Sequence, residues 1–178
     1  MPRMVALLRA VNLGGTNKLP MADLRRVLED GGLRHVETYL QSGNVLFDGD
    51  PASEEHARRI ESLIAQSFGH EIPVLVRERA DLARIVAANP LGKLVENPSR
   101  YTVVFLSAPA DAELAKQLDP SIYQPDVFAV EGREMYIWYP NGIHESKLTV
   151  SLIERRLKVT ATARNWNTVT KLLEKLGG

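Results

Sequence analysis

The sequence predicts an α+β protein made of two ferredoxin-like (βαββαβ) subdomains that arose by internal duplication. Hydrophobic periodicity gives the order strand, helix, strand, strand, helix, strand twice along the chain. Between the two runs, residues 89–99 have the Pro, Gly and Asn content of a linker. The 178 residues suffice for two small subdomains, which we place at residues 1–92 and 93–178, the second ending in an additional helix.

The first half opens with a strand, a helix and a hairpin. Val5–Val11 is an apolar, partly β-branched run that stops at a Gly-containing loop, which predicts a buried strand. Pro20 suits the first position of the next helix, and Gly31-Gly32 ends that helix. Val36–Leu40 and Val45–Phe47 then predict two strands joined by a short turn.

A helix and a strand complete the first repeat. The helix begins at about Ser53, because apolar residues then recur at helical spacing: Ala57, Ile60, Ile64 and Phe68. Pro73–Val76 predicts the fourth strand, and Leu82 begins the apolar side of a short helix that ends near Asn89.

The second half repeats this order of elements. Tyr101–Leu106 predicts a strand and Asp111–Leu118 a helix. Val127–Val130 and Met135–Tyr139 flank a Gly-containing turn, which predicts a hairpin.

Two helices with a strand between them end the chain. A helix covers roughly Leu148–Leu157, where Ser151 and Glu154 have the spacing of a capping box. Val159–Ala163 predicts a strand, and Asn167 suits the N-cap of the last helix.

Composition excludes several classes of chemistry. The chain has 22 Lys+Arg, 22 Asp+Glu and no Cys, so disulfides, iron–sulfur clusters, thiolate zinc sites and thiol nucleophiles are excluded. A formal charge of zero provides no global field for nucleic acid or an anionic membrane. Because neither a signal-peptide core nor a run of roughly 20 apolar residues occurs, we expect a cytoplasmic protein without a membrane partner.

Motifs for metals and cofactors fail on inspection. The four His residues are isolated, and Asp48-Gly49-Asp50 lacks the later ligands of a calcium loop. Gly92-Lys93 lacks the remainder of a phosphate-binding loop, and Gly14-Gly15 lacks the third glycine of a dinucleotide site. Ser42 does not stand in a nucleophile elbow. The sequence therefore predicts neither a bound metal nor a cofactor.

Uncharged polar and basic residues instead gather at four places near the ends of predicted strands and helices. These groups supply cations, amides and hydroxyls but few carboxylates, which suits holding an anion better than acid–base catalysis. A helix starting at Asn167 would place free N–H groups beside Arg164, whose side chain can hold a phosphate bidentately. The predicted ligand-binding residues are Arg9, Asn12, Lys18, Gln41, Ser42, Asn44, Lys147, Arg164, Asn165 and Trp166.

The same residues also have structural interpretations. Residues 144–178 carry seven Lys/Arg and three acids, a net charge of +4, but such charges on helix faces are often only solvated. Asn and Ser in turns commonly bond to the local backbone. Trp166 either fills the core under the last helix or stacks on a base or sugar.

Five stretches together resemble the bacterial domain-of-unknown-function family 1697 (DUF1697). They are Leu8–Lys18, Pro20-Met21-Ala22, Thr38–Val45, Ser146-Lys147-Leu148 and Thr162–Val169. The stretches stand in the family's order and include most of the polar groups described above. The resemblance implies an α+β fold with two subdomains. It implies no catalytic residue, because the family has no assigned activity.

The leading hypothesis is a module that binds an anionic or phosphorylated small molecule, a class that includes nucleotides, in a polar cleft. A second hypothesis is an enzyme that acts on such a ligand by positioning and electrostatic stabilisation. A third is a protein that binds single-stranded nucleic acid, although residues 1–89 carry 11 Lys/Arg against 12 acids. A structural or assembly role is the fourth.

Overall fold

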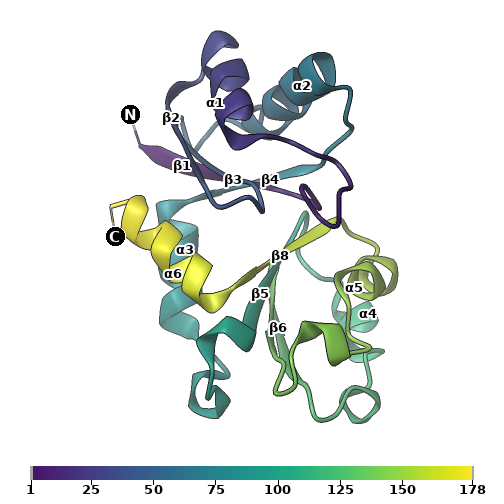
Figure 1. Ribbon diagram of the computed structural model, residues 1–178. Coiled ribbons are helices and arrows are strands. Elements are labelled where there is room, and N and C mark those ends of the chain that lie inside the picture. Colours follow the sequence, from purple (N-terminus) through teal and green to yellow (C-terminus); the bar gives the residue numbers. More distant parts are fainter. Residues whose placement is uncertain (1, 178) are drawn as a thin grey trace. The chain divides into compact units, whose positions relative to one another are not determined.

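The computed structural model describes residues 2–177 and has the predicted mixed α+β architecture (Figure 1). Two four-stranded antiparallel sheets have the strand orders β2-β3-β1-β4 and β6-β7-β5-β8. The chain divides into two compact units, which are Met1–Leu82 with Leu173–Gly178, and Ala83–Leu172. This division differs from the predicted boundary between residues 92 and 93.

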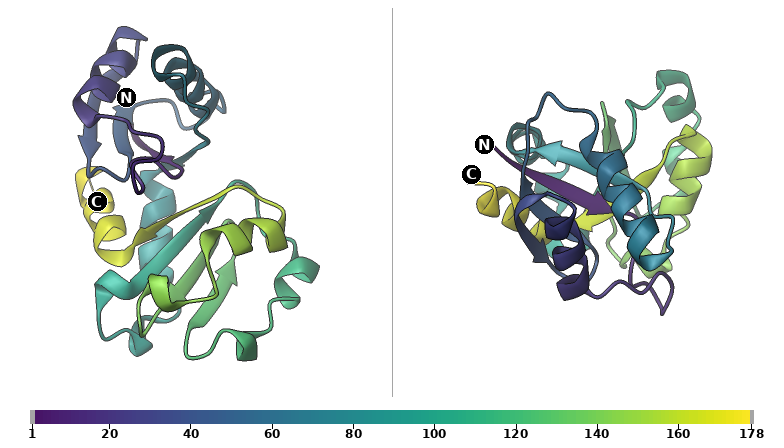
Figure 2. Two further views of the ribbon diagram at one scale, coloured as in Figure 1. Left: turned by 45° about the vertical axis from the view of Figure 1, so that its right-hand side comes forward. Right: turned by 90° about the horizontal axis from the view of Figure 1, so that it is seen from above.

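The first unit contains the predicted strand, helix, strand, strand, helix, strand. These elements are β1 (Arg3–Leu8), α1 (Met21–Asp30), β2 (Arg34–Tyr39), β3 (Asn44–Asp48), α2 (His56–Phe68) and β4 (Val74–Glu78). The central strand β1 pairs with β3 through Val5 opposite Leu46, and with β4 through Ala6 opposite Val76. Helices α1 and α2 cover one face of this sheet (Figure 2).

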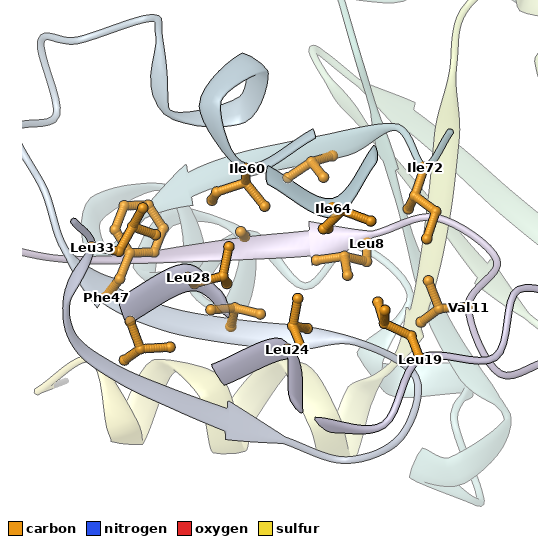
Figure 3. Packing of buried hydrophobic residues seen from close by; sticks show 14 of the residues in the cluster. Leu8, Val11, Leu19, Leu24, Leu28, Leu33, Phe47, Ile60, Ile64 and Ile72 are labelled. Carbon is orange, nitrogen blue, oxygen red and sulfur yellow. The ribbon is translucent and has the colours of Figure 1, made fainter. Parts of the chain in front are cut away.

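The core of the first unit lies between those two helices and the sheet. Leu8 of β1 is fully buried, as are Leu24 and Leu28 of α1 and Ile60 and Ile64 of α2 (Figure 3). Each such side chain contributes about 1.5–3 kcal/mol when fully buried. The helical spacing of these residues therefore both forms and docks the two helices.

Strand β1 is shorter than the apolar run that predicts it. The strand ends at Leu8, not at Val11. Ala10 and Asn12 adopt φ angles of +56° and +55°, which no strand accommodates. Val11 is nevertheless buried, because it packs into the core at the start of the loop that follows β1.

The second unit contains the remaining strands and most of the remaining helical residues. Its elements are α3 (Arg79–Ala88), β5 (Tyr101–Leu106), α4 (Ala112–Lys116), β6 (Val127–Glu131), β7 (Glu134–Trp138), α5 (Val150–Leu157), β8 (Ala161–Asn165) and α6 (Trp166–Lys175), with 3₁₀ turns at Gly92–Leu94, Pro98–Arg100, Pro120–Ile122 and Ile143–Glu145. The first residues of α3 and the last residues of α6 belong to the first unit. None of the described helices is long and apolar enough to cross a membrane.

Both faces of the second sheet are packed. Helices α4 and α5 cover one face over a core that includes Val104 and Ile137. On the other face, the hydroxyl of Tyr136 donates to the carbonyl of Ile85 in α3 at 3.1 Å, and that of Tyr101 donates to Asn89 Oδ1 at 2.9 Å. These bonds hold residues 83–89 to the second sheet, which explains why the division lies inside α3.

The structure corrects both predicted caps near the C-terminus. Helix α5 is capped by Thr149, whose hydroxyl accepts from Leu152 N at 3.1 Å, and not by Ser151. Glu154 accepts from Ala161 N at 2.9 Å instead of closing a capping box. Helix α6 begins at Trp166 rather than after Asn167, because Asn165 Oδ1 accepts from Thr168 N at 3.0 Å.

Candidate functional site

The ten predicted site residues are divided between the two units. The first unit contains Arg9, Asn12, Lys18, Gln41, Ser42 and Asn44, and the second contains Lys147, Arg164, Asn165 and Trp166. Three members of the first group, Asn12, Lys18 and Gln41, line a pocket, whereas Arg164 and Asn165 of the second group build strand β8 and cap helix α6.

The loop between β1 and α1 is held at its base and turns sharply at its tip. Val11 and Leu19 pack into the core at its two ends (Figure 3). At the tip, Thr16 N donates to Leu13 O at 2.8 Å, and Gly14 and Gly15 have φ angles of +54° and +83°. The two glycines therefore serve a tight turn that requires left-handed backbone at both positions.

Asn12 is the clamp of this loop. Its Nδ2 donates to the main-chain oxygens of Leu19 at 3.1 Å and Gln41 at 2.7 Å, and its Oδ1 accepts from Leu19 N at 2.8 Å. The side chain thus bonds to backbone on both sides of the pocket described below. Asn12 lines that pocket chiefly as a structural element.

The Gln-Ser-Gly-Asn turn is likewise built by its last two residues. Gly43 has φ +88°, and a Cβ atom there would lie 2.7 Å from Val11 Cγ2. Asn44 is fully buried, and its Nδ2 donates to Tyr39 O at 2.8 Å and Ser42 Oγ at 3.2 Å. Asn44 therefore shapes the turn, and its predicted part in ligand binding stays a prediction, whereas Gln41 and Ser42 are exposed.

A pocket of about 680 Å³ lies where the loop, the turn and the start of α1 meet. Its lining residues are Asn12, Gly15, Lys18, Leu19, Pro20, Met21, Ala22 and Gln41. We call it the α1 pocket. Among these described residues Lys18 carries the charge, and none has a carboxylate or an imidazole. Arg9 and Ser42 are not among the lining residues.

Two positively charged features border the α1 pocket. Lys18 is exposed, while its carbonyl accepts from His70 Nε2 at 3.1 Å, which fixes the backbone that carries the ammonium. Pro20 stands at the N-cap of α1 and supplies no side-chain cap for the first-turn N–H groups. Asp23 in that turn bonds to Arg26 at 2.8 Å. The positive end of the helix dipole and Lys18 therefore act at the same pocket.

Arg164 lies in the interior of β8 rather than on the surface. Its side chain is buried, and Nη1 donates to Thr162 Oγ1 at 2.7 Å and to Ala163 O at 2.8 Å. Burial lowers the pKa of the guanidinium to about 10, so the group stays charged at neutral pH. The packing of β8 buries the guanidinium and engages it in bonds within the strand, and the predicted role of Arg164 at the centre of an anion site stays a prediction.

The neighbours of Arg164 serve the fold in different ways. Asn165 caps α6, as described above, and is half-buried. The Trp166 ring stacks on Tyr101 with centroids 4.7 Å apart and an interplanar angle of 27°. One face of the indole is therefore covered within the second unit. Lys147 is exposed.

Sequence reasoning missed the apolar side of the α1 pocket. Pro20, Met21 and Ala22 line it, and none of them belongs to the polar clusters of the sequence. The available signal is Pro20 at the start of a helix, where no Ser, Thr, Asp or Asn caps the N–H groups.

Comparison with known proteins identifies the family. A family model described as "Protein of unknown function (DUF1697)" matches residues 1–136. The chain belongs to the DUF1697 family. The match includes the three resembling stretches of the first half, whereas Ser146-Lys147-Leu148 and Thr162–Val169 lie beyond the matched residues.

A solved structure of similar fold is that of the conserved bacterial protein SP0830 from Streptococcus pneumoniae. The two chains are 21% identical, with a TM-score of 0.73, and the similarity covers 98% of each chain. At 21% identity, the similarity between SP0830 and this DUF1697 protein shows a shared fold and nothing further. A search of curated proteins found no match.

Proposed function

We propose that this DUF1697 protein binds an anionic, phosphorylated small molecule in the α1 pocket. The observation that carries the proposal is the meeting of the Lys18 ammonium with the uncapped start of α1 in one pocket of about 680 Å³. Helix N-termini bind phosphate through their free N–H groups and positive dipole end. A lysine beside such an end adds a point charge for the same anion.

The other lining residues suit the rest of such a ligand. Gln41 is exposed and carries an amide that can both donate and accept hydrogen bonds. Pro20 and Ala22 are exposed and give the pocket an apolar wall that can cover a ring or a sugar face. These features favour a phosphate ester, the class that includes nucleotides, over a free inorganic ion.

The lining chemistry supports binding more than acid–base catalysis. The described residues around the α1 pocket have no His, Asp or Glu side chain to move a proton. We retain Lys18 and Gln41 as the residues that contact the ligand, and Asn12 as the residue that holds the two sides of the pocket together. Arg164 and Asn44 are left out because both are buried within the fold.

We also propose that the two units are ferredoxin-like and descend from one duplicated unit. Support comes from the corresponding strand orders, β2-β3-β1-β4 and β6-β7-β5-β8, with two helices over one face in each unit. A cytoplasmic location stays a prediction from the sequence, and cell fractionation tests it.

A thermal-shift experiment tests the binding proposal. The purified protein is titrated with inorganic phosphate, a sugar monophosphate, a nucleoside monophosphate and a short single-stranded oligonucleotide. A ligand at 100 times its Kd adds about 2.7 kcal/mol of stability. We expect a phosphate ester to raise Tm, and Lys18→Glu to remove the shift.

Lys93→Glu is the matched control, since Lys93 is an exposed lysine outside the α1 pocket. It should leave the shift intact. The proposal fails if no phosphate ester shifts Tm or if Lys18→Glu still responds. An oligonucleotide effect that falls steeply with salt and ignores Lys18 would favour the nucleic-acid hypothesis instead.

A further inference from the structure

A second pocket, of about 670 Å³, lies in the second unit beside a buried carboxylate. It is lined by Pro120, Gln124, Pro125, Asp126, Val127 and Phe128, and we call it the β6 pocket. Most of these side chains are apolar. Ile122 and Val127, which are 56% and 37% exposed, add apolar surface in the same segment. The one charged group in the described lining is Asp126.

Asp126 is 7% exposed and held from one side. Ser146 donates its hydroxyl proton to Asp126 Oδ2 at 2.5 Å, and the same hydroxyl accepts from Leu148 N at 2.9 Å. The serine proton is thereby committed to Asp126, whose Oδ2 acts as an acceptor. Tyr139 has a raised pKa, first because it is buried and second because Asp126 carries negative charge nearby.

No cation of the described residues forms an ion pair with Asp126, and Ser146 is the side chain that hydrogen-bonds to it. Buried carboxylates are normally paired with a cation, because a single neutral hydrogen bond does not offset the loss of hydration. Asp126 therefore lacks a counter-charge while facing a pocket large enough for a small molecule.

We propose that the β6 pocket binds a small organic ammonium ion whose charge pairs with Asp126 and whose apolar body packs on Pro125, Val127 and Phe128. A metal ion is disfavoured, since no three His, Asp or Glu side chains among residues 2–177 gather as metal ligands. An ammonium needs one carboxylate and gains a charge-assisted hydrogen bond from it. The site is independent of the α1 pocket in location and opposite in charge preference.

The probe is benzylammonium, with benzyl alcohol as its neutral counterpart, titrated into ¹⁵N-labelled protein and followed by NMR. We expect saturable amide shifts at residues 122–124, 126–128 and 146. Benzyl alcohol should bind at least about tenfold more weakly, since hydrogen bonds to charged groups contribute about 1.5–3 kcal/mol. Equal affinity of the two probes, or shifts dispersed over surface carboxylates, would overturn the proposal.

Two variants and a control locate the charge. Asp126→Asn keeps an oxygen for the Ser146 hydroxyl and should reduce benzylammonium affinity at least about tenfold without lowering Tm. Val127→Lys places a competing ammonium on the half-exposed wall and should also reduce binding, whether or not Asp126→Asn folds. Glu131→Gln removes an exposed carboxylate at the end of β6 and should change nothing. Unchanged affinity in either variant at position 126 or 127 contradicts the inference.

Discussion

The Asn12 side chain donates to the main-chain oxygen of Gln41 at 2.7 Å, and so ties the loop after β1 to the turn between β2 and β3. This bond joins two polar segments that lie 29 residues apart in the sequence. Both segments border the α1 pocket. The shape of that pocket therefore depends on the side-chain amide of Asn12. In the sequence, nothing distinguishes this residue from the other polar residues of the loop.

Removing this clamp should destabilise the first unit. Asn12→Ala loses three side-chain hydrogen bonds to backbone and places Ala at φ +55°, so we expect a loss of about 2–3 kcal/mol in the free energy of unfolding. Urea denaturation measures it. Asn12→Asp keeps the acceptor for Leu19 N but sets a carboxylate oxygen against the main-chain oxygens of Leu19 and Gln41, so it should destabilise the fold at least as much as Asn12→Ala. If Asn12→Ala leaves the free energy of unfolding unchanged, the loop is held by other contacts.

Two asparagines near the start of α6 should differ sharply in stability. Asn165→Ala removes the cap of Thr168 N and should cost about 1 kcal/mol. Asn167 is exposed and lies inside the helix, so Asn167→Ala should stay within about 0.5 kcal/mol of the wild type. Thermal or urea unfolding of the two variants shows which asparagine caps α6. Equal costs, or a larger cost at Asn167, would restore the cap predicted from the sequence.

Arg164→Ala should act on folding rather than on ligand affinity alone. The change removes donors to Thr162 Oγ1 and Ala163 O and leaves a cavity, and we expect a loss of about 2 kcal/mol or more. Lys147→Ala, at an exposed position of the same unit, should change stability by less than about 0.5 kcal/mol. If urea denaturation finds the two variants equally stable, Arg164 is not a structural residue.

Asp48 should make stability depend on acid pH. The hydrogen bond with His35, supported by Arg3 at 3.2 Å, lowers the pKa of the Asp48 carboxyl. A carboxyl with a lowered folded-state pKa stabilises the fold above its unfolded value of about 3.9, and this contribution is lost as pH falls through the folded pKa. Urea denaturation should therefore show a higher free energy of unfolding for the wild type than for Asp48→Asn at pH 7. This difference should become smaller toward pH 3.

Asp30→Asn, at an exposed carboxylate that ends α1, provides the comparison for Asp48. The difference in free energy of unfolding between Asp30→Asn and the wild type should not become smaller between pH 7 and pH 3. A gap for Asp48→Asn that stays constant between pH 7 and pH 3 would mean that the carboxyl titrates alike in the folded and unfolded states.

The fold was largely predictable because its signals are local. Met21, Leu24 and Leu28 repeat at helical spacing, and the same residues are the buried side of α1. Helix starts were less predictable, since Asn165 and Asn167 are equally good caps in isolation. The hydrogen bond of Thr168 N to Asn165 decides between them, and only the three-dimensional structure shows it.

The candidate site was predictable only in part, because polarity does not reveal burial. Thr162 and Arg164 share one face of β8, and that face is buried by tertiary packing. The polar side chains of Asn12 and Asn44 serve the fold, because they form hydrogen bonds with main-chain oxygens. Lys18 and Gln41 stay at the pocket surface, although their sequence context is no more distinctive than that of the buried residues.

The most direct measurement is an NMR titration of ¹⁵N-labelled protein with a nucleoside monophosphate, in wild type and in Lys18→Glu. Saturable amide shifts should appear at residues 18, 19, 21, 22 and 41 of the wild type and disappear in the variant, since the start of α1 and Lys18 hold the phosphate together. Shifts that spare those residues, or that persist unchanged in Lys18→Glu, would contradict an anion site at the α1 pocket.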